Sequence, residues 1–186
     1  PQVLGVLQSL PVEAGADLLI GLPGSHSKWV DVVDGCITHF DTFMTGEVFA
    51  VLSEHSILGR TQQHSATFDA QAFDRGVQIA QSADGELGVL STLFSARTLG
   101  LTGELSPTAQ ADYLSGLMIG HELAALASAQ RRRRNKPNLP SIILIGNAQL
   151  CARYSRALDA CGFARVLLAE QATERGLWQL AVAAGL

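Results

Sequence analysis

The sequence lacks several features that would assign it to common classes of protein. Its 186 residues carry 13 Lys and Arg against 17 Asp and Glu, a formal net charge of -4 at pH 7. Without a basic excess there is little to neutralise nucleic-acid phosphates, so we predict no nucleic-acid partner. No apolar stretch approaches the roughly 20 residues of a membrane span, and the chain does not open on the basic and apolar segments of a secretory signal. We therefore expect no membrane partner and a cytoplasmic location.

Cysteine is also scarce. Cys36, Cys151 and Cys161 are an odd number, and no pair has Cys-x-x-Cys spacing. This predicts neither a zinc site nor a disulfide framework, and we expect reduced, buried thiols. What the sequence does have is 47% apolar content over a length that suits one domain with a substantial core.

The first third of the chain predicts three short strands, at residues 18–22, 28–33 and 37–43. Asp34-Gly35 between the last two is a typical two-residue hairpin turn. After Thr45-Gly46 the apolar period changes from two to that of a helix, with Glu47 in the first turn.

The rest of the chain predicts helices at about 68–130, and then a strand at 141–145, a helix from Asn147, a strand at 165–168 and a closing helix. The longest helix is expected at 108 to about 130, with Ser106 as N-cap and Pro107 as its first residue. The four arginines at 131–134, followed by Asn135-Lys136-Pro137, are predicted to end this helix in a solvated loop.

Three antiparallel strands followed by helix, strand, helix, strand and helix resemble the ribonuclease H-like unit shared by actin, hexokinase and the Hsp70 ATPase domain. The predicted fold is therefore α/β, with a mixed five-stranded sheet in which three antiparallel strands are followed by parallel ones. A helical insertion is expected at about 60–130.

The first candidate site is the turn Gly24-Ser25-His26-Ser27-Lys28 between the first two strands. Glycine lets a ligand approach the backbone, and backbone N–H groups together with a lysine can hold phosphate. An ordinary polar hairpin turn would have a similar composition. A Walker loop is excluded, because the Gly-Lys-Ser/Thr ending is missing and the segment leads into a strand.

Two further junctions resemble anion-binding sites. Thr45-Gly46-Glu47 and Gly146-Asn147 each lie where a strand passes into a helix, and the N–H groups at a helix start favour anions. Thr45 and Asn147 could equally be ordinary helix caps. We expect all three junctions to lie at one end of the sheet and to converge on a cavity for a triphosphate and its purine.

Other polar residues carry less weight. His121-Glu122 lacks the second histidine of a zinc protease motif, and His121 is expected to be packed or at an interface. No carboxylate is identified as a general base, and no cluster specifies a metal site. A small hydrolase using Ser25 is a weaker alternative, because no nucleophile-elbow motif surrounds this serine.

Several segments together resemble one family. They are Leu22-Pro23-Gly24-Ser25-His26-Ser27-Lys28-Trp29-Val30, Phe40-x-Thr42-x-Met44-Thr45-Gly46-Glu47, His55-Ser56-Ile57-Leu58-Gly59, Tyr113-Leu114-Ser115-Gly116-Leu117-Met118-Ile119-Gly120 and Gly146-Asn147-Ala148-x-Leu150-x-Ala152-Arg153-Tyr154. The chain is similar to the C-terminal portion of 2-dehydro-3-deoxygalactonokinase, from about Gln2 to the last helix.

The resemblance implies a carbohydrate kinase that uses ATP and Mg²⁺ to phosphorylate the 6-hydroxyl of 2-dehydro-3-deoxy-D-galactonate. It implies that Gly24, Ser25, His26 and Lys28 face the ATP phosphates, that Thr45, Gly46 and Glu47 line the same cleft, and that Gly146 and Asn147 approach adenosine.

The family also has an N-terminal domain with an Asp-x-Gly-Thr loop and an Arg-Gly-Glu-Glu segment, and neither motif occurs in this sequence. Residues 1–186 are thus expected to be one C-terminal, ATP-side domain that binds nucleotide weakly, has no kinase activity alone, and partners the N-terminal domain of the same enzyme. An uncovered cleft face could lead to self-association as a homodimer. The alternative is a stand-alone, non-catalytic nucleotide-binding or scaffold module.

Overall fold

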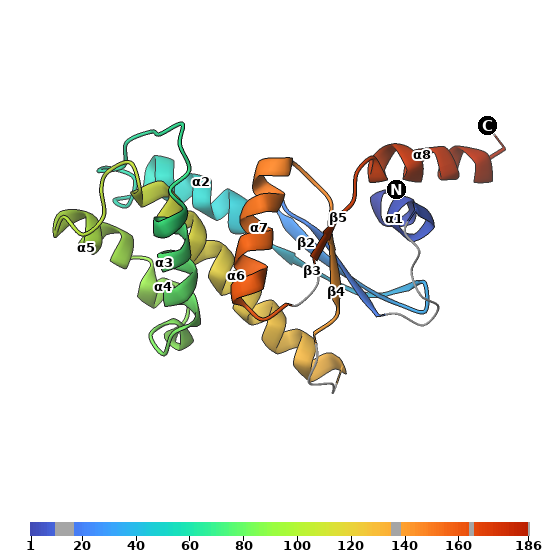
Figure 1. Ribbon diagram of the computed structural model, residues 1–186, viewed down its shortest axis with the longest axis horizontal. Helices are drawn as coiled ribbons and strands as arrows, with labels where there is room; N and C mark the ends of the chain where they lie inside the picture. The colour runs from blue at the N-terminus through green and yellow to red at the C-terminus, as the bar shows by residue number, and fades with distance from the viewer. Residues whose placement is uncertain (10–16, 135–138, 164–165, 186) are drawn as a thin grey trace. The chain divides into compact units, whose positions relative to one another are not determined.

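The computed structural model describes residues 1–9, 17–134, 139–163 and 166–185 (Figure 1). The chain forms two compact units: the first comprises Pro1–Phe43, Pro140–Ala152 and Phe163–Leu186, and the second comprises Met44–Leu139 and Arg153–Gly162. In chain order the elements are α1 (Gln2–Ser9), β1 (Leu18–Leu22), β2 (Ser27–Val33), β3 (Cys36–Phe43), α2 (Thr45–His55), α3 (Ala70–Gln81), the 3₁₀ turn η1 (Gly85–Leu87), α4 (Val89–Thr92), α5 (Ser95–Leu101), α6 (Gln110–Arg134), β4 (Ser141–Leu144), α7 (Ala148–Ala160), β5 (Val166–Leu168) and α8 (Ala172–Ala183).

The first unit contains a five-stranded sheet with the order β3-β2-β1-β4-β5. β2 runs antiparallel to both β1 and β3, whereas β4 runs parallel to both β1 and β5. This mixed sheet, with three antiparallel strands followed by parallel ones, confirms the predicted ribonuclease H-like fold.

The hairpin and the alternation of apolar residues explain why these strands form. Asp34 and Gly35 have φ values of 49° and 75°, as expected for a two-residue turn whose twist matches the strands it joins. One face of the sheet forms a core with α1 and α8, made of Val6, Leu18, Ile20, Val30, Val32, Ile143, Ile145 and Ala172. Leu18 and Ile20 lie two residues apart, so the period of a strand places both on this face.

Helices α1 and α8 lie against each other at very short range (Figure 1). A Cβ atom on Gly5 would lie 2.0 Å from the Ala172 carbonyl oxygen, and one on Gly176 would lie 1.8 Å from the Pro1 carbonyl oxygen. Both positions therefore require glycine, because no side chain fits between the two backbones.

The second unit is helical, and its centre is the packing of α3 against α6. Its buried apolar cluster consists of Leu58, Ala72, Ala80, Ala96, Leu105, Ala109, Tyr113, Leu114, Leu117 and Met118. Glycines again allow the close approach, since a Cβ on Gly76 would lie 2.2 Å from the Tyr113 carbonyl oxygen.

The bounds of α6 correct the sequence prediction at both ends. The helix begins at Gln110 rather than 108, and Ser106 is not its N-cap: the Ser106 hydroxyl contacts the Thr108 hydroxyl, 3.1 Å away, in the preceding turn. At the other end the helix continues through the arginine run to Arg134. Arginine is a good helix former, and because Arg131, Arg132 and Arg133 are exposed, water screens their repulsion. Asn135-Lys136-Pro137 lies outside the described residues.

The cysteine prediction is partly wrong. All three thiols are free, as expected, and Cys151 is buried, but Cys36 is exposed and Cys161 is partly buried. Cys36 follows the hairpin turn at the start of an edge strand, and such positions have few neighbours to cover them.

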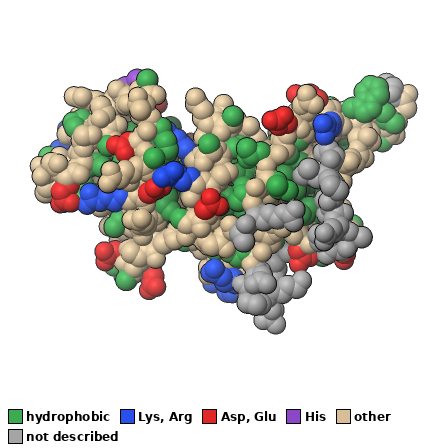
Figure 2. All heavy atoms as spheres, viewed as in Figure 1, with side chains coloured by type: hydrophobic (Ala, Val, Ile, Leu, Met, Phe, Trp, Pro, Cys, Tyr) green, Lys and Arg blue, Asp and Glu red, His purple; other side chains and the backbone are tan. Residues whose placement is uncertain are grey.

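Surface charges of the two signs are mixed. Among the described residues on the face shown in Figure 2, Lys and Arg side chains are interspersed with Asp and Glu side chains, in keeping with the net charge of -4. Within the described ranges no helix has both the length and the apolar character needed to cross a bilayer.

Candidate functional site

Two of the three predicted junctions are neighbours in the first unit. Gly21 of β1 is paired with Leu144 of β4, and the Ile145 N–H group donates to the Gly21 carbonyl oxygen at 2.9 Å. One step further, a Cβ on Gly146 would lie 3.4 Å from the Pro23 carbonyl oxygen. Because β1 and β4 are parallel, their carboxyl ends lie at the same end of the sheet. The two segments that follow these strands therefore leave the sheet side by side.

The turn after β1 is open to solvent. Gly24 does not have a left-handed φ, and a Cβ atom placed there would meet nothing within 4 Å. Ser25, His26 and Lys28 are exposed, whereas Ser27 at the start of β2 is fully buried. The Lys28 ammonium donates to the His26 carbonyl oxygen at 3.3 Å. The turn thus presents a hydroxyl, an imidazole and an ammonium beside a bare stretch of backbone, a combination that can accommodate an anion.

The junction after β4 is a helix cap. The Asn147 Oδ1 atom accepts hydrogen bonds from the N–H groups of Gln149 at 3.0 Å and Leu150 at 3.2 Å, at the start of α7. The capping role considered for Asn147 is therefore present. Gly146 and Asn147 are both exposed, so a ligand can reach this end of α7.

The third junction belongs to the second unit. Thr45 is the first residue of α2 and not its N-cap; Met44 occupies the cap position and makes no side-chain cap bond. Thr45 is buried, Gly46 is partly buried and Glu47 is exposed in the first turn. The convergence of this junction with the other two stays a prediction.

No ready-made metal cage is found in the part of the chain that the structure describes, where no group of three or more His, Cys, Asp or Glu side chains could hold an ion. Glu47 is the carboxylate among the predicted site residues. Mg²⁺ in phosphoryl-transfer enzymes is usually held by one or two carboxylates together with the substrate phosphates. A single carboxylate at the predicted site is in keeping with this mode of binding.

His121 is packed, as predicted. Its Nε2 atom lies 2.7 Å from the Thr92 hydroxyl, and burial lowers the pKa of the imidazole. Nearby in the same unit, the Tyr113 hydroxyl lies 2.6 Å from the Ser95 hydroxyl, and burial raises the Tyr113 pKa. These pairs connect α6 to the short helices α4 and α5, which is a structural role.

Sequence reasoning missed the contacts of Arg153 on α7. The Arg153 guanidinium lies 2.8 Å from the Asp112 carboxylate, donates to the Ser115 hydroxyl at 3.2 Å, and stacks 4.6 Å from the centre of the Phe68 ring. The second Asp112 oxygen accepts the Asp69 N–H group at 2.8 Å. These contacts join α7 and α6 to the segment before α3, and nothing in the local sequence marks them because the partners lie 38 residues or more apart.

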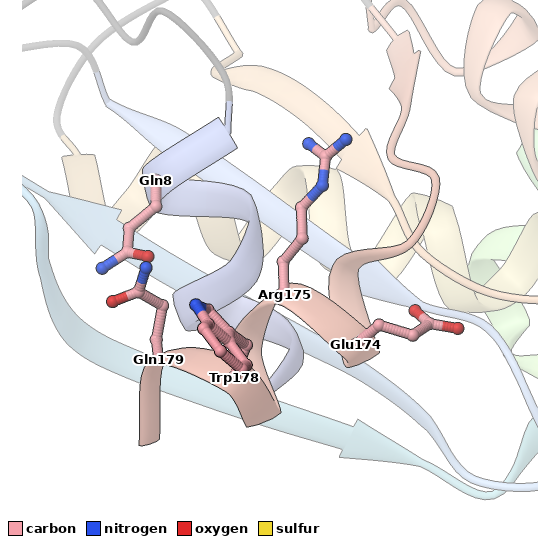
Figure 3. A pocket seen from close by; sticks show the side chains of 5 residues that line it. All are labelled: Gln8, Glu174, Arg175, Trp178 and Gln179. Atoms are coloured by element: carbon pink, nitrogen blue, oxygen red, sulfur yellow. The ribbon is translucent and has the colours of Figure 1, made fainter. Parts of the chain in front are cut away.

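A pocket occurs elsewhere in the first unit, between α1 and α8. It has a volume of about 550 Å³ and is lined by Gln8, Glu174, Arg175, Trp178 and Gln179 (Figure 3). None of the predicted site residues contributes to it. The predicted nucleotide site and this pocket are therefore separate features of the unit.

The order and directions of the strands define a ribonuclease H-like α/β protein. A family model described as 2-keto-3-deoxy-galactonokinase matches residues 1–180. The chain belongs to this 2-keto-3-deoxy-galactonokinase family.

Individual relatives agree with this assignment. The chain is 34% identical over 181 residues to a "Probable 2-dehydro-3-deoxygalactonokinase" of Rhizobium meliloti (strain 1021), covering 95% of this chain and 55% of that protein. It is 31% identical over 144 residues to the 2-dehydro-3-deoxygalactonokinase of Escherichia coli (strain K12), covering 76% of this chain and 45% of the relative. A crystal structure of a Sinorhizobium meliloti protein assigned to the same activity superposes with a TM-score of 0.81 at 29% identity, over 98% of this chain and 58% of that one. The chain thus spans about half the length of the curated relatives it matches.

Proposed function

We propose that this chain is the ATP-side part of a sugar-acid kinase that transfers the γ-phosphoryl group of ATP to the 6-hydroxyl of 2-dehydro-3-deoxy-D-galactonate. Membership of the family supports the reaction, since its curated relatives carry the name of this kinase. The nucleotide site is inferred from one observation: the Gly24 turn and the Gly146 junction are adjacent at the same end of the sheet.

Each junction has a distinct role in this proposal. Gly24 leaves space for the phosphates to approach the backbone, and Ser25, His26 and Lys28 donate to the phosphate oxygens. Gly146 and Asn147 face the adenosine, and the second-unit residues Thr45, Gly46 and Glu47 line the same cleft. In phosphoryl transfer the bond from the γ-phosphorus to the leaving ADP oxygen breaks as the bond to the acceptor oxygen forms, and positioning with charge stabilisation supplies most of the catalysis.

Magnesium enters the proposal as part of the substrate, Mg²⁺–ATP. Bound there, it would neutralise charge on the phosphates. What the chain itself contributes in this proposal is the Lys28 ammonium and the Glu47 carboxylate, and we assign no further ligand.

The acceptor side lies elsewhere in this proposal. We infer that residues 1–186 form one C-terminal domain with a helical insertion at about 60–130, and that an N-terminal domain of the same enzyme supplies the sugar-acid contacts and the general base. The support is that the matched region accounts for 55% and 45% of the two curated relatives.

The nucleotide site is tested by replacing Lys28 and comparing two ligands. Lys28→Ala removes a charge-assisted donor to phosphate, so we expect about tenfold weaker binding of ATP and unchanged binding of adenosine. Titration into the full chain followed by NMR measures both affinities, even when they are weak. Arg175→Ala is the matched control, since it removes another exposed cation from the same unit outside both junctions. Equal losses for ATP and adenosine, or no loss for either, would contradict the assignment of the turn to phosphate.

A further inference from the structure

The outer strand of the sheet, β3, has the properties of a pairing surface. It is eight residues long, stands at the end of the strand order, and has β2 as its strand neighbour within the described residues. Most of its residues are exposed, including Ile37 at 56% and Phe40 at 67%. Its sequence contains neither proline nor lysine, two residues with which proteins commonly block such edges.

The centre of β3 is complementary to itself. When two copies run antiparallel with Phe40 opposite Phe40, His39 of each copy stands opposite Asp41 of the other. Within one chain the His39 Nε2 atom already lies 3.2 Å from the Asp41 carboxylate, because residues two apart share a face of the strand. Donor and acceptor groups therefore alternate around the two-fold axis, and the contact between His39 and Asp41 occurs twice.

From this pattern we propose that β3 is a homodimer interface, in which two copies of the chain join their sheets antiparallel about a two-fold axis through Phe40. The partner is a second copy because the register that matches His39 with Asp41 and aromatic with aromatic is the register of the strand with itself. A self-complementary patch on a two-fold axis is the usual arrangement of protein dimers. Aromatic cross-strand pairs stabilise a sheet, and an imidazole N–H group can donate a hydrogen bond to a carboxylate oxygen. This inference does not depend on the proposed kinase function.

The irregularity in the β2–β3 pairing limits the length of the interface. Asp31 pairs with His39 and Val32 pairs with Ile37, so Thr38 is an extra residue and the regular part of the edge begins at His39. Phe40 pairs with Val30, which faces the core formed with α1 and α8. The two Phe40 rings would therefore extend this apolar face across the dimer.

The register is tested by cross-linking. In a Cys36→Ser background, Phe40→Cys would place two thiols directly opposite each other, within the Cα separation that a disulfide tolerates. Oxidation of the full chain should give a disulfide-linked dimer. The matched control is Ile37→Cys, an exposed position on the same strand that this register separates from its counterpart by about 20 Å. Equal or preferential cross-linking at position 37 would overturn the register.

The charge pattern is tested by two substitutions with opposite expected effects. His39→Lys strengthens the pair with Asp41 of the other copy, so we expect the dissociation constant of the dimer to fall about threefold to tenfold. Asp41→Lys places only donors around the axis and should raise the dissociation constant of the dimer by a similar factor. Both changes add positive charge, so an effect of overall charge would move both variants in the same direction, which would contradict the proposal. Light scattering over a range of concentrations measures the dissociation constants, and circular dichroism verifies that each variant is folded.

Phe40→Lys provides the remaining check. We expect this variant to be folded and monomeric at concentrations where the parent chain is a dimer. A dimer that persists in Phe40→Lys would place the interface elsewhere, for example on the exposed apolar residues of α8 such as Trp178. A parent chain that stays monomeric at every concentration would also overturn the proposal.

Discussion

Strand geometry gives the neighbouring residues Ser27 and Lys28 opposite environments at the end of the turn. Ser27 is fully buried and begins β2, whereas Lys28 is exposed beside the open space at Gly24. Side chains of successive strand residues point to opposite faces, so one residue anchors the turn and the next is free to contact a ligand. The same separation makes Lys28 a suitable position for the binding experiment, because an exposed side chain can be changed with little effect on folding.

His121 makes stability depend on pH. Burial lowers its pKa in the folded chain, whereas the unfolded chain has the ordinary value near 6.5. Below this value the unfolded state takes up a proton that the folded state resists, so the contribution to stability is present above pH 6.5 and is lost as the pH falls. We expect the melting temperature to drop by a few degrees between pH 7.5 and 5.5, as measured by circular dichroism.

His121→Gln is the control for this prediction, because the amide can still hydrogen-bond to the Thr92 hydroxyl but does not titrate. The variant should show a smaller drop over the same range of pH. Identical pH profiles for the two proteins would show that other groups cause the loss.

The packing of helix α3 against helix α6 depends on glycines, which have no side chain. A Cβ on Gly116 would lie 2.0 Å from the Phe73 carbonyl oxygen, and one on Gly120 would lie 2.7 Å from the Ala80 Cβ atom. Together with Gly76 these residues let the two backbones approach, and the apolar cluster around Tyr113 and Leu117 closes over the contact. The glycines cost helix propensity, which the closer packing offsets.

Gly116→Ala should therefore destabilise the chain even though alanine is the better helix former. Relief of the clash requires a shift of one helix, and overpacking of this kind costs about 1–3 kcal/mol. Unfolding in urea, followed by circular dichroism, gives the free energy of unfolding. The matched control is Gly24→Ala, the same substitution at a position with open space and no left-handed φ. Its stability should stay within about 0.5 kcal/mol of the parent chain, and a stabilised Gly116→Ala variant would refute the close approach of α3 and α6.

At the scale of the whole molecule, the chain spans about half the length of its curated relatives. A kinase reaction needs the nucleotide and the acceptor held in one geometry, and our proposal assigns residues of this chain to the nucleotide and none to the acceptor. Nucleotide binding and phosphoryl transfer can therefore be separated experimentally, and they test different parts of the proposal.

We expect the chain of 186 residues to produce no ADP that depends on 2-dehydro-3-deoxy-D-galactonate. The reason is that effective positioning, which supplies most of the rate in phosphoryl transfer, requires both substrates to be held. A coupled ADP assay with a heat-inactivated control measures this. Sugar-acid-dependent turnover would contradict the division of roles, while the failure of a longer form of the enzyme to turn over would favour the non-catalytic module.

Much of the fold could be predicted from local sequence. The three antiparallel strands were placed within one residue of their observed bounds, because alternating apolar residues and the Asp34-Gly35 turn act over short distances. The two ends of α6 could not be placed as well. Helix ends depend on which backbone groups find partners, and at Ser106 the turn satisfied them differently from a standard cap.

By itself the sequence determined the succession of strands and helices along the chain, the glycine turn after β1, the strand-to-helix junction at Gly146 and the family, since each is encoded in residues close together in the chain. Only the tertiary structure decided that the Gly24 turn and Gly146 are neighbours, that Arg153 meets Asp112 and Phe68, and that β3 is left as an exposed edge. Such contacts join residues separated by tens of positions, and their geometry is set by which surfaces must be buried together rather than by local preference.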